Sequence, residues 1–168
     1  QGGKYQTACE AGRLFAASNQ AAVAATAGLA TTWTGLGVAN PTGSGRMLVM
    51  QEFAWALTLA GPAAGCVGLM TSTDSGFAAA ITVRNRKFGG PASIAYVDDG
   101  ATIATPVLEQ IVGEFGTLAS TAYPQSGPHV ANLEGGLILL PGRSVLTYTT
   151  LACTAALIFS FLWEEIPI

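Results

Sequence analysis

The residues that could carry chemistry in this chain are few and far apart. His129 is the single histidine and lies in the segment Gly127-Pro128-His129-Val130. A Ser-His-Asp triad would have to use His129, yet no G-x-S-x-G motif or other nucleophile signature accompanies it. We therefore interpret His129 as a solvated turn residue and predict that the chain has no catalytic residues and is not an enzyme.

Acidic residues offer two further kinds of site. Asp98-Asp99-Gly100 lacks the spaced ligands of a calcium-binding loop, so we interpret it as a hairpin turn. Glu164 and Glu165 are adjacent in an alternating segment, where neighbouring side chains point to opposite faces of a strand. They cannot act together as the carboxylate pair of a glycoside hydrolase, and we expect them to keep a strand end soluble. A carboxylate pair across elements, including Glu109 or Glu114, stays open.

The three cysteines are Cys9, Cys66 and Cys153, an odd number without C-x-x-C spacing. This pattern fits neither a zinc site nor a disulfide framework. We expect Cys66 and Cys153 to behave as small buried hydrophobic residues, and we predict no metal and no cofactor.

Aromatic side chains are the remaining candidates for binding. Trp55 and Trp163 fall on the large-residue faces of alternating segments, so we assign both to the core. Tyr96 and Tyr123 lie near turns and are the candidates for an exposed platform on which a sugar ring would stack.

Charge is scarce throughout the chain. Charged residues make up 10% of the sequence, hydrophobic residues 50%, and the net charge is −3. Because a typical soluble domain carries about 25% charged residues, we expect much of this surface to be covered by other chains. The acidic balance argues against nucleic-acid binding, and the cluster Arg84–Lys87 fits a solvated turn or a subunit contact. The apolar run Leu151–Trp163 is shorter than the about 20 residues that a membrane helix needs, so we predict no membrane segment.

Turn signals recur at short intervals and predict an all-β sandwich or barrel. The clearest strand is Met47–Leu59, whose odd positions carry most of its large side chains, with a bend or bulge expected near Gln51-Glu52. Pro141-Gly142 predicts a tight turn between two strands. Alternation returns over Thr154–Glu165, and its apolar second face predicts a central strand or a covered one.

Weaker strands are expected in six further segments, and one helix is weighed against a strand. These segments are Arg13–Ala17, Ala21–Ala25, Thr31–Val38, Cys66–Thr71, Ala78–Val83 and Ser93–Val97. Thr105–Phe115 fits a short helix with Thr105 as its N-cap and Pro106 near N1, and it fits a strand equally well. Residues 1–12 show no strong periodicity, so we expect an N-terminal arm followed by a single domain over residues 13–168.

Several segments together resemble small virion proteins of tailed bacteriophages. They are Gly12–Gln20, Leu36–Pro41 with the Gly/Ser turn that follows, Leu140–Val145, and Phe159–Glu165. The resemblance implies a jelly-roll-like antiparallel β-sandwich with hairpins at the Asn-Pro and Pro-Gly turns. It also implies a head decoration (cement) protein, which stabilises the capsid by binding the major capsid protein and its own copies, often as a trimer, on the outer surface of the virion.

On this interpretation the N-terminal arm reaches over a neighbouring chain, and its few long side chains, Lys4, Tyr5 and Arg13, are the expected partner contacts. A receptor- or glycan-binding fibre module is the alternative, and it requires an exposed aromatic cleft. A jelly-roll enzyme would need a carboxylate pair or a cleft around His129. The main shell protein is a further possibility, but the scarcity of basic residues argues against a wall that lines a packaged genome.

Overall fold

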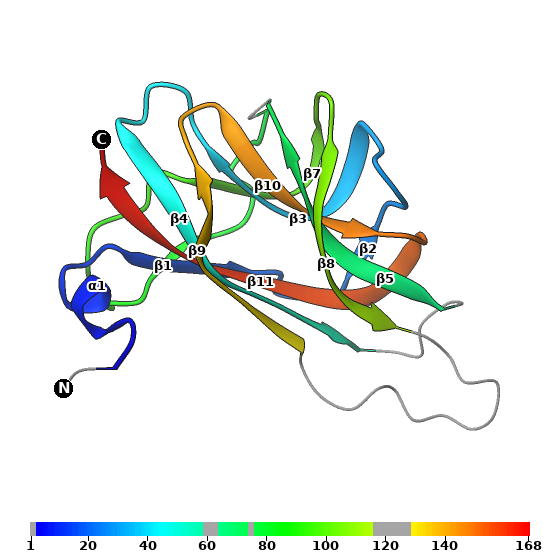
Figure 1. Ribbon diagram of the computed structural model, residues 1–168, viewed down its shortest axis with the longest axis horizontal. Coiled ribbons are helices and arrows are strands. Elements are labelled where there is room, and N and C mark those ends of the chain that lie inside the picture. The colour runs from blue at the N-terminus through cyan, green and yellow to red at the C-terminus, as the bar shows by residue number, and fades with distance from the viewer. Residues whose placement is uncertain (1–2, 59–63, 74–75, 116–128) are drawn as a thin grey trace.

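The computed structural model describes residues 3–58, 64–73, 76–115 and 129–168. These residues form one short helix and two antiparallel sheets packed face to face (Figure 1). In chain order the elements are α1 (Gln6–Glu10), β1 (Leu14–Ser18), β2 (Val23–Ala25), β3 (Thr32–Asn40), β4 (Arg46–Leu57), β5 (Gly65–Ser72), β6 (Arg84–Asn85), β7 (Tyr96–Thr102), β8 (Val107–Phe115), β9 (His129–Leu139), β10 (Arg143–Thr149) and β11 (Cys153–Pro167).

The two sheets have a nested strand order. One sheet runs β6-β1-β11-β4-β9, with β2 against β11, and the other runs β7-β3-β10-β5-β8. Early strands pair with late ones, β1 with β11, β3 with β10, β4 with β9 and β5 with β8. This winding of one long antiparallel ribbon is that of a jelly roll. The predicted all-β, jelly-roll-like antiparallel sandwich is therefore confirmed.

The Asn-Pro and Pro-Gly turns carry the chain from one sheet to the other. Gly142 has φ +81°, which confirms the tight turn, but β9 and β10 that flank it belong to different sheets. The expected hairpins are therefore wrong, because nested winding separates strands that follow one another. Asn40 holds the two crossings together: its Nδ2 donates to the carbonyls of Arg46 and Leu139, both at 2.8 Å, and its own carbonyl accepts from Gly142 N at 2.8 Å.

Strand β4 contains the predicted bulge, and the bulge changes which side chains point inward. Opposite β11, the pairing passes from Glu52 to Met50 and skips Gln51. Leu48 and Met50 are buried on one side of this step, and Phe53 and Trp55 on the other. The expectation that odd positions share one face throughout the strand is wrong, because one inserted residue reverses the alternation.

The core lies between the sheets and is centred on β11. Phe159, Phe161 and Trp163 alternate along β11 and are at most 1% exposed. Phe161 packs on Phe53 of β4 with ring centroids 4.9 Å apart. The predicted central position of this strand and the core assignments of Trp55 and Trp163 are confirmed. Cys153 is also buried, whereas Cys66 is partly exposed.

One open alternative is decided, and one predicted strand is wrong. Of the helix and the strand weighed for Thr105–Phe115, the strand is correct, because Val107–Phe115 forms β8 and pairs with β5 along the edge of its sheet. Thr105 has φ +40° and does not cap a helix, because the chain turns there to enter the sheet edge. Residues 78–83 form no strand: Ala79 has φ +57°, and the pairing resumes only at β6. Propensity was ambiguous in both segments: pairing with β5 made one a strand, and the other has no strand partner.

Candidate interaction surfaces

The three predicted partner contacts make bonds within their own chain. Lys4 Nζ lies 2.6 Å from Glu134 Oε1 on β9 and 5.1 Å from the centre of the Tyr5 ring. The hydrogen bond to Glu134 raises the pKa of Lys4, and burial raises the pKa of the Tyr5 phenol. Arg13 directly precedes β1 and pairs with β11 instead, where its Nη2 lies 3.0 Å from Glu164 Oε1. The structure thus brings Lys4 and Tyr5 together and keeps Arg13 apart.

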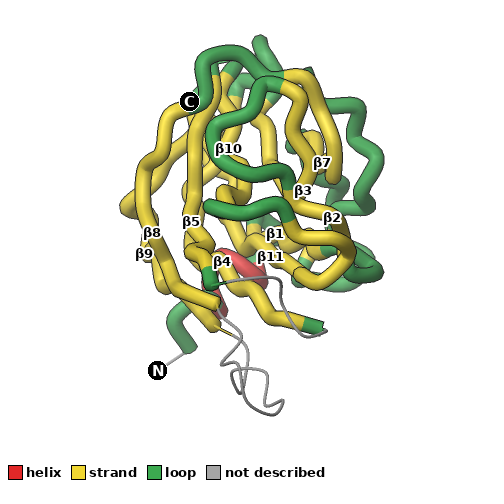
Figure 2. Tube along the Cα trace, turned by 90° about the vertical axis from the view of Figure 1, so that its right-hand side faces the viewer, coloured by secondary structure: helices red, strands yellow, loops and turns green. Residues whose placement is uncertain are grey.

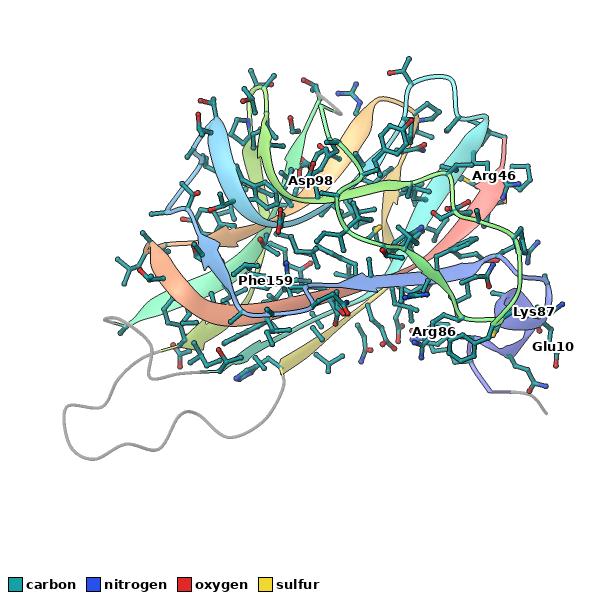
Figure 3. All side chains as sticks on the ribbon, turned by 180° about the vertical axis from the view of Figure 1, so that it is seen from behind. Glu10, Arg46, Arg86, Lys87, Asp98 and Phe159 are labelled. Atoms are coloured by element: carbon teal, nitrogen blue, oxygen red, sulfur yellow. The ribbon has the colours of Figure 1, made fainter. Side chains whose placement is uncertain are left out.

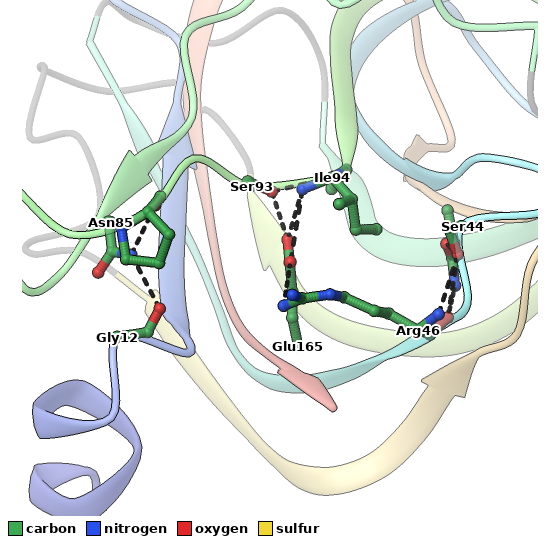
Figure 4. A network of polar contacts seen from close by, with 10 residues as sticks. Gly12, Ser44, Arg46, Asn85, Ser93, Ile94 and Glu165 are labelled. Carbon is green, nitrogen blue, oxygen red and sulfur yellow. Dashed lines mark hydrogen bonds and ion pairs between the residues drawn. The ribbon is translucent and has the colours of Figure 1, made fainter. Parts of the chain in front are cut away.

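Glu165 is fully buried at the end of β11 (Figure 4). Its carboxylate accepts hydrogen bonds from Ser93 Oγ and from Ile94 N, the second at 3.1 Å, and lies 3.5 Å from Arg46 Nη1. The expectation that Glu165 keeps a strand end soluble is wrong, because β11 is central and this side chain points inward. The prediction that Glu164 and Glu165 point to opposite faces is confirmed, since Glu164 pairs with Arg13 instead.

Asp98 and its neighbours lie inside strand β7, so the predicted hairpin turn is wrong. The pairing with β3 shifts register here, between Thr34 and Gly37. Asp98 is buried, and its carboxylate accepts backbone N–H bonds from Ala78 at 2.7 Å and from Asp99 at 2.8 Å. The bond from Ala78 N to Asp98 thus connects the bulged edge strand β7 to the loop before β6.

His129 begins β9 and stacks on Trp55, with ring centroids 4.3 Å apart and planes 10° from parallel. It is a partly exposed strand residue rather than a solvated turn residue. Tyr96 is 43% exposed. Tyr123 lies outside the described residues.

The described ranges contain no group of three or more histidine, cysteine or acidic side chains that would hold a metal ion. Within the same ranges no helix is long and apolar enough to cross a membrane.

Exposed apolar side chains gather where the edge strands β8 and β9 lie side by side (Figure 2). Between these strands runs a groove of about 320 Å³, which we call the β8–β9 groove. Ile138 and Leu140 line it and are 49% and 54% exposed. Glu109 also lines the groove, held by a hydrogen bond of 2.6 Å from Thr71 Oγ1, and Arg143 lies at its wall. The groove is thus apolar and carries one charge of each sign.

Both edge strands are interrupted by bulges. In β8 the pairing with β5 skips Glu109 and Val112. In β9 Glu134 and Gly135 have φ of +51° and +80°, where the pairing with β4 also shifts. Bulges of this kind discourage the addition of another strand to a sheet edge. The groove is therefore suited to receiving side chains rather than an extended backbone.

The second exposed apolar feature is Phe88, which follows β6 at the opposite edge of the same sheet from β9. Its side chain is 87% exposed, the highest value among the large hydrophobic residues that the structure describes. Arg86 and Lys87 precede it and lie beside α1 (Figure 3). We call residues 86–90 the Phe88 turn.

The sequence pattern indicates the basic cluster as a turn or subunit contact but does not indicate Phe88 itself. Phe88 belongs to no periodic segment, so no alternation of apolar and polar faces points to it. The available signal was a single aromatic residue between Arg86-Lys87 and Gly89-Gly90-Pro91. A single exposed apolar side chain is ordinary on a protein surface, so Phe88 stands out by the extent of its exposure and by the basic residues beside it.

Comparison with protein-family models found no match. Comparison with curated proteins found none either. No solved structure matched the fold closely enough to be counted.

Proposed function

We propose that this chain is a non-enzymatic structural subunit of a virion, a decoration protein that binds a capsid shell and its own copies. The observation that carries this proposal is the exposed apolar surface of the β8–β9 groove and the Phe88 turn on a chain with few charges. Exposed apolar patches rimmed by polar residues are typical of protein–protein contact sites. The resemblance to phage virion proteins points to the same class of assembly.

The arrangement of the carboxylates supports a structural role. Glu165 and Asp98, two of the acidic residues that drew attention in the sequence, are bound by backbone N–H groups. Glu164 is paired with Arg13. Such carboxylates stabilise the fold, because each is bonded to its own chain: Glu165 and Asp98 accept backbone N–H bonds, and Glu164 pairs with a partly exposed guanidinium. The jelly-roll fold also occurs in viral capsid domains, although a fold alone does not specify function.

Particle composition tests this proposal directly. In virions purified from the chain's own virus, quantitative mass spectrometry should find hundreds of copies per particle, and electron cryomicroscopy should place them outside a separate shell. A variant lacking residues 1–12 should stay folded and lose shell binding if the N-terminal segment contacts the capsid. Absence of the chain from purified particles, or its location in the inner wall, would contradict the proposal.

A glycan-binding fibre module is the second candidate, and one observation favours it. Tyr96 and Phe88 line the same shallow depression, together with Arg84. Aromatic faces beside a polar side chain are suited to stacking against sugar rings. A glycan array with the whole chain, repeated with Tyr96→Ala, would favour this candidate if binding appears and is lost in the variant.

A further inference from the structure

Phe88 is held in place before any partner arrives. Gly90 N donates to Lys87 O at 2.8 Å across the turn, and Gly89 has φ +82°, which a glycine adopts readily. The turn thus places Phe88 at its tip. Because the backbone of the turn is already ordered, little backbone entropy is lost on binding, and an exposed aromatic residue on such a turn is well suited to anchor an interface.

Three further bonds tie the turn to the rest of the molecule. Asn85 Oδ1 accepts from Lys87 N at 2.9 Å, and Asn85 Nδ2 donates to Gly12 O at 2.9 Å (Figure 4). Lys87 Nζ donates to Glu10 O at 2.8 Å. These bonds to α1 and the residues after it hold the base of the turn, while the Phe88 ring makes no use of the core.

We propose that the Phe88 turn of one copy inserts into the β8–β9 groove of a second copy, so that the chains associate head to tail. This inference rests on the proposed function, because it assumes a subunit that binds its own copies. The groove cannot receive Phe88 of its own chain. β6 and β9 lie at opposite ends of the sheet, four strand spacings or about 19 Å apart.

The charges favour a head-to-tail contact over a symmetric one. Arg86 and Lys87 flank Phe88, whereas Glu109 lines the groove and Glu114 follows it on β8. Neither Arg86 nor Glu109 has an ion-pair partner within the part of the chain that the structure describes. A turn-to-turn contact would bring the cations of two copies together, and a groove-to-groove contact would leave both hollows without a protruding side chain to fill them. The contact between unlike surfaces places the protruding Phe88 ring in a hollow and its basic neighbours beside Glu109.

Arg143 sets the orientation of the docked turn. It lines the groove as well, so Arg86 and Lys87 must lie toward Glu109 and away from Arg143. Each copy would use one turn and one groove, leaving one of each free at the ends of a pair. Such a contact between unlike surfaces continues until a ring closes or a filament grows.

Complementation between two variants tests the proposal. Phe88→Ala removes the anchor and keeps the groove, whereas Ile138→Asp charges the groove and keeps the anchor. Sedimentation velocity of the full chain should show assemblies larger than a dimer for the unmodified protein. The self-association of each variant alone should be weaker by about 30-fold or more, as expected for loss of an anchor residue. An equimolar mixture should form a dimer and nothing larger, because only one intact turn meets one intact groove.

The controls separate this contact from a general loss of apolar surface or of folding. Leu29 is 47% exposed and lines neither surface, so Leu29→Ala and Leu29→Asp should assemble like the unmodified chain. Near-ultraviolet circular dichroism checks that each variant is folded. If Ile138→Asp does not fold, Glu109→Lys replaces it in the mixture.

Three results would overturn the inference: an unmodified chain that stays monomeric at all concentrations, a variant that assembles normally by itself, or a mixture that remains monomeric. A symmetric dimer through two grooves or two turns gives the second of these, because one of the two variants keeps that surface intact. The proposed function fails by a different observation, because particles that lack the chain would contradict it even if copies associate in solution.

Discussion

Beside the first residues of β4, its two neighbouring strands β11 and β9 place polar and apolar side chains in opposite ways. Beside the beginning of β4, the structure buries a charged group, Glu165, and surrounds it with Ser93, Ile94 N and Arg46. Along β9, it leaves Ile138 and Leu140 about half exposed beside a groove. A charged side chain is thus buried at the end of β11, whereas apolar side chains are exposed at the end of β9.

The buried carboxylate and the exposed apolar side chains have explanations of different kinds. The buried carboxylate is accounted for by partners in its own chain, since its oxygens accept hydrogen bonds from the partly buried Ser93 Oγ and Ile94 N and lie beside Arg46. The exposed apolar side chains have no such account within the described chain. Because exposed apolar area is stabilised by removal from water, their explanation points to another molecule.

The largest effect should come from contrasting an inner and an outer apolar residue. Phe53→Ala removes a fully buried ring that packs on Phe159 and Phe161, so we expect it to lower the free energy of unfolding by about 3–5 kcal/mol. Ile138→Ala should cost less than about 1 kcal/mol, because the side chain is half exposed. Urea denaturation at a protein concentration too low for association measures both. Equal losses would mean that the groove is part of the core.

The next effect concerns the buried charge. Glu165→Ala leaves Ser93 Oγ and Ile94 N without their acceptor, and we expect a loss of about 2–4 kcal/mol in the free energy of unfolding. Glu165→Gln keeps an acceptor oxygen and should lose less. Glu134→Ala is the matched control, since its carboxylate is exposed and should leave the denaturation midpoint unchanged. A Glu165→Ala protein as stable as the control would show that this network does not stabilise the fold.

Sequence patterns identified local features better than their long-range partners. The bulge in β4 and the tight turn at Pro141-Gly142 follow from neighbouring residues, and both were predicted. The burial of Glu165 and the separation of β9 from β10 depend on pairings between residues more than 70 positions apart, such as the bond from Ser93 to Glu165. No local rule contains such pairings, which is why the strand order could not be derived from the chain alone.

The same limit applies to the candidate surfaces. The low charge predicts that part of the surface meets other chains, and the basic cluster lies in one of the two surfaces proposed for such contact. The β8–β9 groove was hidden, because Val107 to Phe115 fitted a helix as well as a strand. Its counterpart Ile138 was assigned to a hairpin. Only the nested winding places these two edge strands side by side.

A smaller effect should follow from one glycine behind the groove. A side chain at Gly68 of β5 would put its Cβ 2.5 Å from the backbone oxygen of Gln110 on β8. Gly68→Ala must therefore push β8 outward, and we expect a loss of about 1–3 kcal/mol together with weaker self-association. Denaturation and sedimentation measure the two results. Gly43→Ala is a comparison for packing, because nothing lies within 4 Å of its Cβ position, although its φ of +76° also carries a backbone cost.

The smallest effect concerns thiol chemistry inside and outside the sandwich. Burial raises the pKa of the Cys153 thiol, so at pH 8 less of it is thiolate and its reaction with a disulfide reagent should be about tenfold or more slower than that of a free thiol.

With Cys9 and Cys66 replaced by serine, Leu140→Cys adds a thiol at the groove. That thiol should react at once in dilute protein and become protected as the concentration rises, because association covers the groove. Protection that does not change with concentration would mean that no second copy covers Leu140, whereas rapid labelling of Cys153 would mean that the interior beside β11 opens to water.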